Sequence, residues 1–226
     1  MTNATEPREL TLAMGAGDLL NMLGNTVLFA SKDDTLPVLC TVKLSVKDQH
    51  VTAYATDRYR LARVKRPVKL VEGDWASVPH ALMERSVVDA FVKLLKGEKH
   101  ALKNNLDAHL IATVHGNAVV SWRIMAGNSQ SSMGQTVNAE FPRIESLFPD
   151  REPTDPAGMM AFNPAFLADM AKVKDLTARD NEPLRLVGGS NSGKPASFYR
   201  YDWFEGLLMP VRLPVGSTFG NYNLAA

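Results

Sequence analysis

The sequence predicts an α+β protein made of repeated units, with the helices on one side of the sheets. Three observations support this. The same order of signals, one strand, one amphipathic helix and then a run of strands, recurs three times along the chain. Apolar residues repeat at helical spacing in one segment of each unit. The other segments are short, alternate in polarity and are separated by turn residues, as expected for small antiparallel sheets.

The first unit, residues 9–66, opens with an apolar strand at 10–14. In the next segment, 18–30, leucine, methionine and valine fall on one broad helical face. Asp18 is placed to favour the N-terminal end of the helix dipole. A break at Leu36-Pro37 follows, and strands are expected at 38–46, 51–55 and 60–65.

The second unit, residues 74–149, repeats this plan. Its first strand is expected at 75–79, and its helix at 86–96 is ended by Gly97. We expect the tract 127–132 to be a mobile surface loop. The remaining strands of the unit are predicted at 106–114, 118–125 and 134–140.

A linker rich in proline and acidic residues, 150–158, marks the best domain boundary. We therefore expect residues 1–150 to form one domain of two units, and 151–226 to hold the linker, a third unit and a short tail. The third unit opens with a strand at 159–162, and Asn163-Pro164 is a typical helix start. Its helix is expected to bury Phe166, Leu167, Met170 and Val173, and strands are expected at 184–187, 196–202 and 206–213.

Charge and cysteine content exclude several classes of protein. The 25 Lys plus Arg residues are balanced by 24 Asp plus Glu, so any basic face must be local. The single Cys40 cannot form an internal disulfide, and its apolar neighbours favour a buried, inert thiol. No leader-like segment and no long uncharged apolar run is present, which indicates a cytoplasmic protein without a membrane span.

No motif supports catalysis, a metal site or a cofactor. The five histidines lack metal-ligand spacing, and no GxSxG elbow occurs. Residues 188–194, GGSNSGK, match the first seven positions of a phosphate-binding loop. Pro195 then stands where that loop needs a hydroxyl and a backbone N–H, and the following residues alternate like a strand. We therefore interpret this tract as a hairpin loop and regard a nucleotide-binding enzyme as the least favoured reading.

Two groups of basic residues could contact phosphates. Between Lys43 and Lys69 there are eight basic and two acidic residues, which indicates either a phosphate-binding surface or a solvated sheet face. On the predicted helices, Lys93, Lys96, Lys172 and Lys174 should point outward. Three helices on one side could present these lysines to a polyanion, although ordinary solubilising lysines remain the slightly better interpretation.

Three segments then resemble one known family. Residues 55–62, ATDRYRLA, resemble the ATDxxRLA signature of bacterial β sliding clamps, the processivity factors of replicative DNA polymerase. Residues 141–149, FPRIESLFP, and 208–213, LMPVRL, resemble two further segments of that family, in the same order. The family has six units in three domains, whereas this chain has three units. The third unit looks like the last half of the final domain.

The resemblance implies a groove that binds short clamp-binding peptides. By position, its apolar floor would comprise Leu39, Leu61, Pro142, Leu147, Leu207 and Met209, and its polar edge Thr56, Arg58, Tyr59 and Arg60. Arg58 and Tyr59 replace a frequent Gly-His pair, and Ser146 stands at an often basic position, so peptide preference can differ. Without the resemblance, Leu39, Leu61, Leu207 and Met209 would be read as core.

The implied function is that of a non-enzymatic sliding clamp on duplex DNA, independent of base sequence. The family's twelve-unit ring would need four copies of a three-unit chain, or three copies if each holds four units. The implied partners are a replicative DNA polymerase, other proteins with clamp-binding peptides, and a clamp loader. The chain length suits a bacteriophage clamp. An alternative is a clamp-like adaptor or decoy that binds such peptides without closing a ring.

Overall fold

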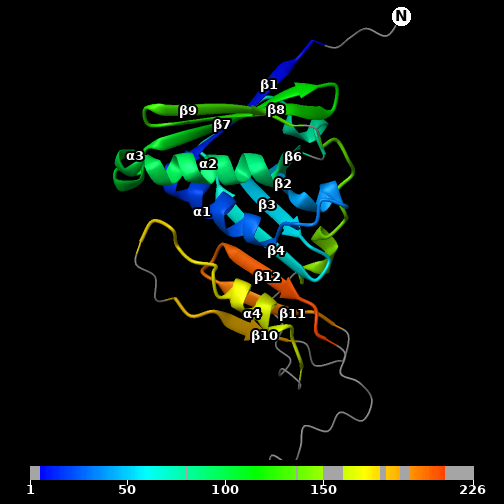
Figure 1. Cartoon of the computed structure of the whole chain (residues 1–226). Helices are drawn as coiled ribbons and strands as arrows, with labels where there is room; N and C mark the ends of the chain where they lie inside the picture. Colours follow the sequence, from blue (N-terminus) through cyan, green and yellow to red (C-terminus); the bar gives the residue numbers. More distant parts are fainter. Residues whose placement is uncertain are drawn as a thin grey trace, which may run out of the picture.

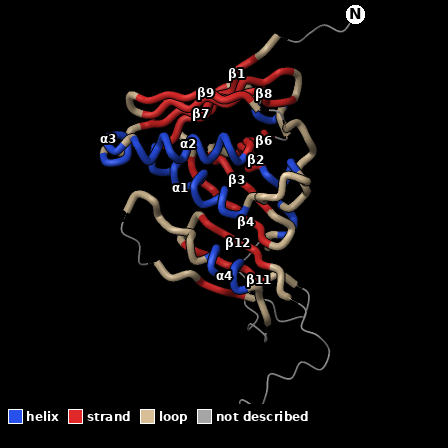
Figure 2. The backbone as a smooth tube through the Cα atoms, in the orientation of Figure 1, coloured by secondary structure: helices blue, strands red, loops and turns tan. Residues whose placement is uncertain are grey.

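The computed structural model describes residues 6–79, 81–135, 137–149, 160–178, 182–188 and 194–211. Its helices are α1 (Ala16–Thr26), α2 (Arg85–Gly97), α3 (Lys99–Lys103) and α4 (Pro164–Met170). In Figure 1, α1 is drawn in front of the cyan strands and α4 in front of the orange strands. In Figure 2, α2 is seen below the strands β7, β8 and β9. The predicted α+β class is therefore confirmed.

Two antiparallel sheets make up the rest of the described fold. The five-stranded sheet has the order β5 (Leu70–Glu72), β1 (Arg8–Gly15), β7 (Asp107–His115), β8 (Ala118–Ala126) and β9 (Ser129–Gly134). The seven-stranded sheet has the order β10 (Arg185–Val187), β11 (Ala196–Arg200), β12 (Phe204–Leu208), β4 (Arg60–Pro67), β3 (His50–Thr56), β2 (Thr41–Lys47) and β6 (Ala81–Glu84).

The first two units exchange their opening strands. β1 of the first unit pairs with β7 of the second, with Leu12 opposite Leu110. In return, β6 of the second unit pairs with β2 of the first, with Met83 opposite Val42. The helices α1 and α2 pack against each other. The exchange and the helix contact together join the two units around one apolar core.

The third unit extends the seven-stranded sheet. β12 pairs with β4, with Gly206 opposite Ala62, so the sheet continues from the first unit into the third. The Met170 sulfur lies 3.3 Å from the position that a Cβ on Gly206 would occupy, which shows how closely α4 packs on β12. Asn163 begins α4 as predicted, because its side chain accepts a hydrogen bond from the Ala165 N–H.

Several predicted strands need correction. Residues 75–79 do not form a strand, because Asp74 caps a short 3-10 turn at Trp75–Ser77 and the opening strand is β6. The tract 127–132 is not a loop: after a turn it forms most of the edge strand β9. Of the strand predicted at 134–140, only Gly134 lies in a strand, as the last residue of β9, and the other described residues of that range do not. A run of serines carries no apolar alternation, so pairing with β8 decides this strand.

The third unit also differs from expectation. Residues 160–162 are not assigned to a strand, and residue 159 lies outside the described residues. Met170 and Val173 are buried as predicted, but Leu167 is 37% exposed, so the predicted buried stripe is wrong at that position. Cys40 is half-buried and its thiol contacts the Asp33 carbonyl. Burial raises the pKa of the Cys40 thiol, which keeps it protonated.

The tract that resembles a phosphate-binding loop is followed by a strand. Residues 189–193 lie outside the described residues, but β11 begins at Ala196 and pairs with both β10 and β12. A phosphate-binding loop requires a helix at that point, so the hairpin interpretation is favoured. No helix in the described part of the chain has the length and apolar character needed to cross a bilayer.

Candidate functional site

One carboxylate fixes the turn between β3 and β4. Asp57 accepts hydrogen bonds from the backbone N–H groups of Tyr59 (3.1 Å) and Arg60 (2.8 Å), and from the Arg60 guanidinium at 2.7 and 2.9 Å. The Thr56 hydroxyl donates to the Arg60 carbonyl at 2.9 Å, and Arg58 takes a φ of 80°. The side chains of Arg58 and Tyr59 are left exposed, Tyr59 by 52%.

The end of β12 lies beside this turn. Leu207 pairs in register with Leu61, and the backbone N–H of Met209 donates to the Tyr59 carbonyl at 2.9 Å. Met209 keeps 37% of its surface exposed. The first and last of the three motif segments are therefore neighbours in space, although about 150 residues separate them in the chain.

The middle motif segment, residues 141–149, packs on the same strands. Lys43 Nζ donates to the Glu145 carboxylate at 2.5 Å and anchors the segment to β2. Leu147 then remains 55% exposed. Other residues of the same segment, Phe141, Ile144 and Phe148, belong to one buried cluster together with Tyr54, Leu61, Leu82 and Leu207.

The ten residues implied as a groove divide into two sets by exposure. Those that are buried are Leu39, Thr56, Arg60, Leu61 and Leu207. Those that are exposed are Arg58, Tyr59, Pro142, Leu147 and Met209. A partner can reach only the second set, while the first set belongs to the core and to the turn that support it.

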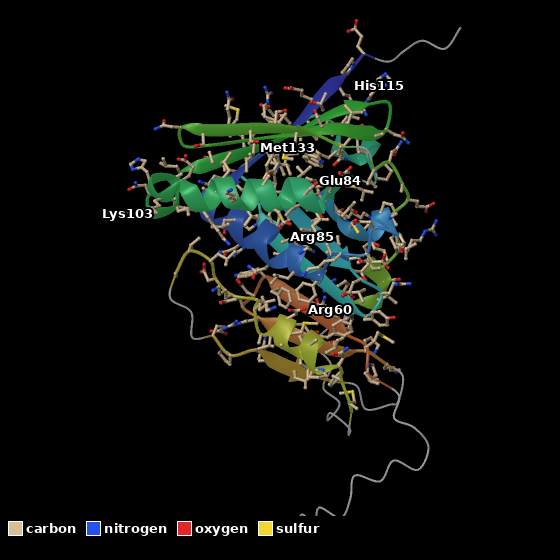
Figure 3. All side chains as sticks on the ribbon, viewed as in Figure 1. Arg60, Glu84, Arg85, Lys103, His115 and Met133 are labelled. Atoms are coloured by element: carbon tan, nitrogen blue, oxygen red, sulfur yellow. The ribbon has the colours of Figure 1, made fainter. Side chains whose placement is uncertain are left out.

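Arg60 joins the β3–β4 turn to α4 instead of forming an open polar edge. Its side chain is 8% exposed and bridges Asp57 at 2.7 Å and Asp169 at 2.5 Å. Its guanidinium lies 4.7 Å from the centre of the Phe166 ring, on which Tyr59 also stacks at 5.5 Å. Figure 3 shows Arg60 at this boundary. We call the contact formed by these five residues the unit junction.

Electrostatics hold the unit junction in its charged form. Burial raises the pKa of the Asp169 carboxyl, but hydrogen bonds from Lys172 and Arg60 outweigh it, so the pKa lies below its ordinary value. A cavity of about 410 Å³ lies on this junction and is lined partly by Arg58, Tyr59 and Arg60. No local sequence pattern predicts the role of Asp169, because its partner Arg60 is 109 residues away.

A second set of contacts fastens the first unit to the segment after α4. The Asn25 amide, which is 1% exposed, donates to the Lys174 carbonyl at 3.0 Å and accepts from its N–H at 2.9 Å. Asn21 likewise donates to Asp175 at 3.0 Å and accepts from the Leu176 N–H at 2.7 Å. These buried amides fix the third unit against α1.

Internal ion pairs account for most of the basic residues between 43 and 69. Six of the eight form ion pairs, namely Lys43, Arg58, Arg60, Arg63, Arg66 and Lys69. The four lysines predicted to point outward from the helices, Lys93, Lys96, Lys172 and Lys174, are all exposed. Lys172 pairs with Asp169 at 2.5 Å. Lys93, Lys96 and Lys174 form no ion pair with any residue that the structure describes.

Sheets that continue from one unit to the next, with helices on one side, define a sliding-clamp fold. The DNA polymerase sliding clamp from Bacillus subtilis matches with a TM-score of 0.67 and 14% identity, over 95% of this chain and 67% of that chain. A DnaN sliding clamp from Bartonella birtlesii, bound to griselimycin, matches with a TM-score of 0.65 and 18% identity, over 90% and 66%. At these identities the likeness establishes the fold.

Sequence comparison establishes the family. The beta sliding clamp of Micrococcus luteus is 28% identical over 158 residues, which is 70% of this chain and 46% of that protein. A family model described as DNA polymerase III beta subunit, central domain, matches residues 15–129, half of the chain. The chain belongs to this family, and the predicted resemblance is confirmed. It spans less than half the length of the curated relatives that it matches.

Proposed function

We propose that the chain is a DNA sliding clamp, a non-enzymatic processivity factor that encircles duplex DNA as a homo-oligomeric ring. The seven-stranded sheet carries this proposal, because it passes without a break from the first unit to the third through β4 and β12. Edge-to-edge extension of sheets is a geometry by which successive units can close into a ring. Membership of the family supports the same conclusion.

The helix side of the sheets would face the DNA. Exposed Lys93, Lys96 and Lys174 can contact phosphates without reading base sequence. Three units per chain give four chains for the twelve-unit ring that the family resemblance implies. A clamp loader would open such a ring. Light scattering together with electron microscopy tests the assembly: we expect closed rings at micromolar concentration, and a strict monomer would contradict the ring.

Partner proteins, including a replicative polymerase, would dock on the exposed groove residues. Tyr59, Leu147 and Met209 offer exposed apolar surface around the buried cluster, and Arg58 supplies charge beside it. An extended peptide with hydrophobic anchors is suited to such a surface. One structural neighbour, the DnaN sliding clamp from Bartonella birtlesii, is bound to griselimycin, which supports a ligand-binding surface on this fold.

The groove is tested by measuring the binding of a fluorescent clamp-binding peptide by polarisation. Met209→Ala should weaken binding by about fivefold or more, since removal of an anchor costs at least about 1 kcal/mol. Met125→Ala is the matched control, because Met125 is similarly exposed at 41% but lies on β8. Equal affinities of the two variants would refute the groove.

The same measurements separate the alternatives. A monomer that binds the peptide at the groove would be the adaptor or decoy instead of the ring. Excess nucleotide with magnesium should leave the melting temperature unchanged, because a strand follows Pro195 where a phosphate site needs a helix. A rise of several degrees would favour nucleotide binding.

A further inference from the structure

The third unit repeats half of the strand exchange that joins the first two. In those units the last three strands are consecutive antiparallel neighbours, β2-β3-β4 and β7-β8-β9. The first of each set, β2 or β7, receives the opening strand of the other unit. In the third unit β10-β11-β12 has the same order, so β10 occupies the receiving position.

The receiving edge of β10 is free of strand pairing within the described residues. β10 pairs with β11 on one side and ends the seven-stranded sheet on the other. Leu186, in the middle of β10, is 45% exposed. An open edge that carries an exposed leucine is a template for pairing with another chain.

The segment that could be donated is also present. Residues 160–163 directly precede α4, as β1 precedes α1 and β6 precedes α2. The Ala161 carbonyl accepts a hydrogen bond from the Val211 N–H at 2.7 Å. Val211 follows β12, just as β5, which flanks β1, follows β4. One side of the segment is therefore occupied as in the first unit, but no described strand pairs with the segment.

The helix of the third unit shows the same lack of a partner. α1 and α2 pack against each other, and each buries several residues. Within α4 only Met170 is buried, and Leu167, which belongs to the apolar stripe, is 37% exposed. An apolar helix face of this kind is normally covered by another element.

We propose that a second copy of this chain covers the third unit, each copy adding residues 160–163 to β10 of the other across a two-fold axis. The unit carries both the segment to be donated and the receiving edge, so two identical copies satisfy each other, as an isologous contact requires. The ten residues 150–159 are too few to hold another unit within the chain. The pairing refines the homo-oligomer of the proposed function, because four chains joined in pairs give twelve units.

The test measures mass by light scattering for the full chain and for two variants. We expect an even number of chains in the wild type. Leu186→Asp should halve the mass by placing a charge on the pairing edge, and Leu167→Asp should act likewise. Met125→Asp is the matched control, because Met125 is exposed to a similar degree on β8, and its mass should not change.

Hydrogen exchange of the wild type provides a test without substitutions. Amides of 160–163, and those of 185–187 that do not bond to β11, should lose protection on dilution, while those of the β2–β6 pair should not. An odd number of chains, an unchanged mass in both folded variants, or protection independent of concentration would overturn the pairing. If the Leu186→Asp variant still forms rings, the proposed pairing is wrong but the clamp function stands. If the mass of the variant is halved but the wild type does not enclose DNA, the pairing stands but the clamp function is wrong.

Discussion

Replacing Arg60 by alanine should loosen the contact between the first and third units. Arg60 is the only member of the unit junction that touches both Asp57 and Asp169. Its guanidinium also covers the Phe166 ring at 4.7 Å. The variant Arg60→Ala removes the cation that Asp57 and Asp169 share, so Asp57, which is 12% exposed, loses its cation, and Asp169, which is 28% exposed, keeps only Lys172.

The structure sets the expected magnitude. Removing one partner from a buried ion pair costs about 3–5 kcal/mol, because the remaining charge stays desolvated. Asp169 is 28% exposed and can regain water, so we expect the lower end, about 3 kcal/mol. The neighbouring Arg58 is the matched control: its contact with Asp33 is 3.8 Å long, and both side chains are about half exposed. Arg58→Ala should therefore cost less than about 1 kcal/mol.

Urea unfolding followed by tryptophan fluorescence measures both variants at one fixed protein concentration. A double-mutant cycle with Asp169→Ala should show a coupling of about 1–3 kcal/mol between Arg60 and Asp169. If Arg60→Ala and Arg58→Ala differ by less than about 0.5 kcal/mol, the unit junction does not stabilise the fold as argued.

Three further predictions test the packing between the units. Gly24→Ala should destabilise the fold by about 1–3 kcal/mol, because a Cβ there would lie 2.5 Å from a Leu176 methyl group. In the control Gly97→Ala the new Cβ faces open space, so this variant should be more stable than the wild type by up to about 1 kcal/mol. Equal shifts of the melting temperature in the two variants would contradict this. Asn25→Ala should lower the free energy of unfolding in urea by about 2–3 kcal/mol, because the Lys174 carbonyl and N–H lose the hydrogen bonds that the buried amide makes with them. A change below about 0.5 kcal/mol would disprove the contact. Burial raises the pKa of the Asp175 carboxyl, but hydrogen bonds from Thr177 and Asn21 lower it by more, so the net pKa lies below its ordinary value. The carboxylate therefore stabilises the fold above about pH 4, and this stabilisation is lost as the pH falls through the lower pKa of the folded state. The stability gap between the wild type and Asp175→Asn in urea unfolding should close as the pH is lowered below about 4, and a gap that does not change with pH would contradict this.

Apolar periodicity was enough to predict α1, α2, α4 and most of the strands, but not the five-residue helix α3. Five apolar residues predict α2; four of them, Val87, Val88, Phe91 and Leu95, are buried, and the fifth, Leu94, is half-buried. β9 escaped prediction because serines and glutamine have no alternation to detect, and only pairing with β8 makes that segment a strand. The tract 75–79 reads as apolar, but hydrogen bonds to Asp74 make it a short turn.

The candidate site could be predicted only in part. The resemblance identified Arg58, Tyr59 and Met209, which the structure brings side by side. It did not reveal that Arg60 is withdrawn from the surface, because burial of a cation depends on carboxylates supplied from distant positions. Asp169 lies outside the apolar stripe predicted for α4, and a helical pattern carries no information about a turn 109 residues earlier.

The distribution of charge bears on how such a protein could hold DNA. Most of the basic side chains between residues 43 and 69 form internal ion pairs, several of them with acidic residues from other segments. This agrees with the near-zero net charge of the chain. Lys93, Lys96 and Lys174 form no ion pair with a described carboxylate, and the same holds for the exposed Lys99 and Lys103 on α3. Affinity for DNA grows with the number of phosphates neutralised, so this small number of lysines per chain gives weak binding that salt weakens further. Lasting attachment would therefore have to come from enclosure of the duplex, which makes the contacts that close the ring more important than any single contact with phosphate.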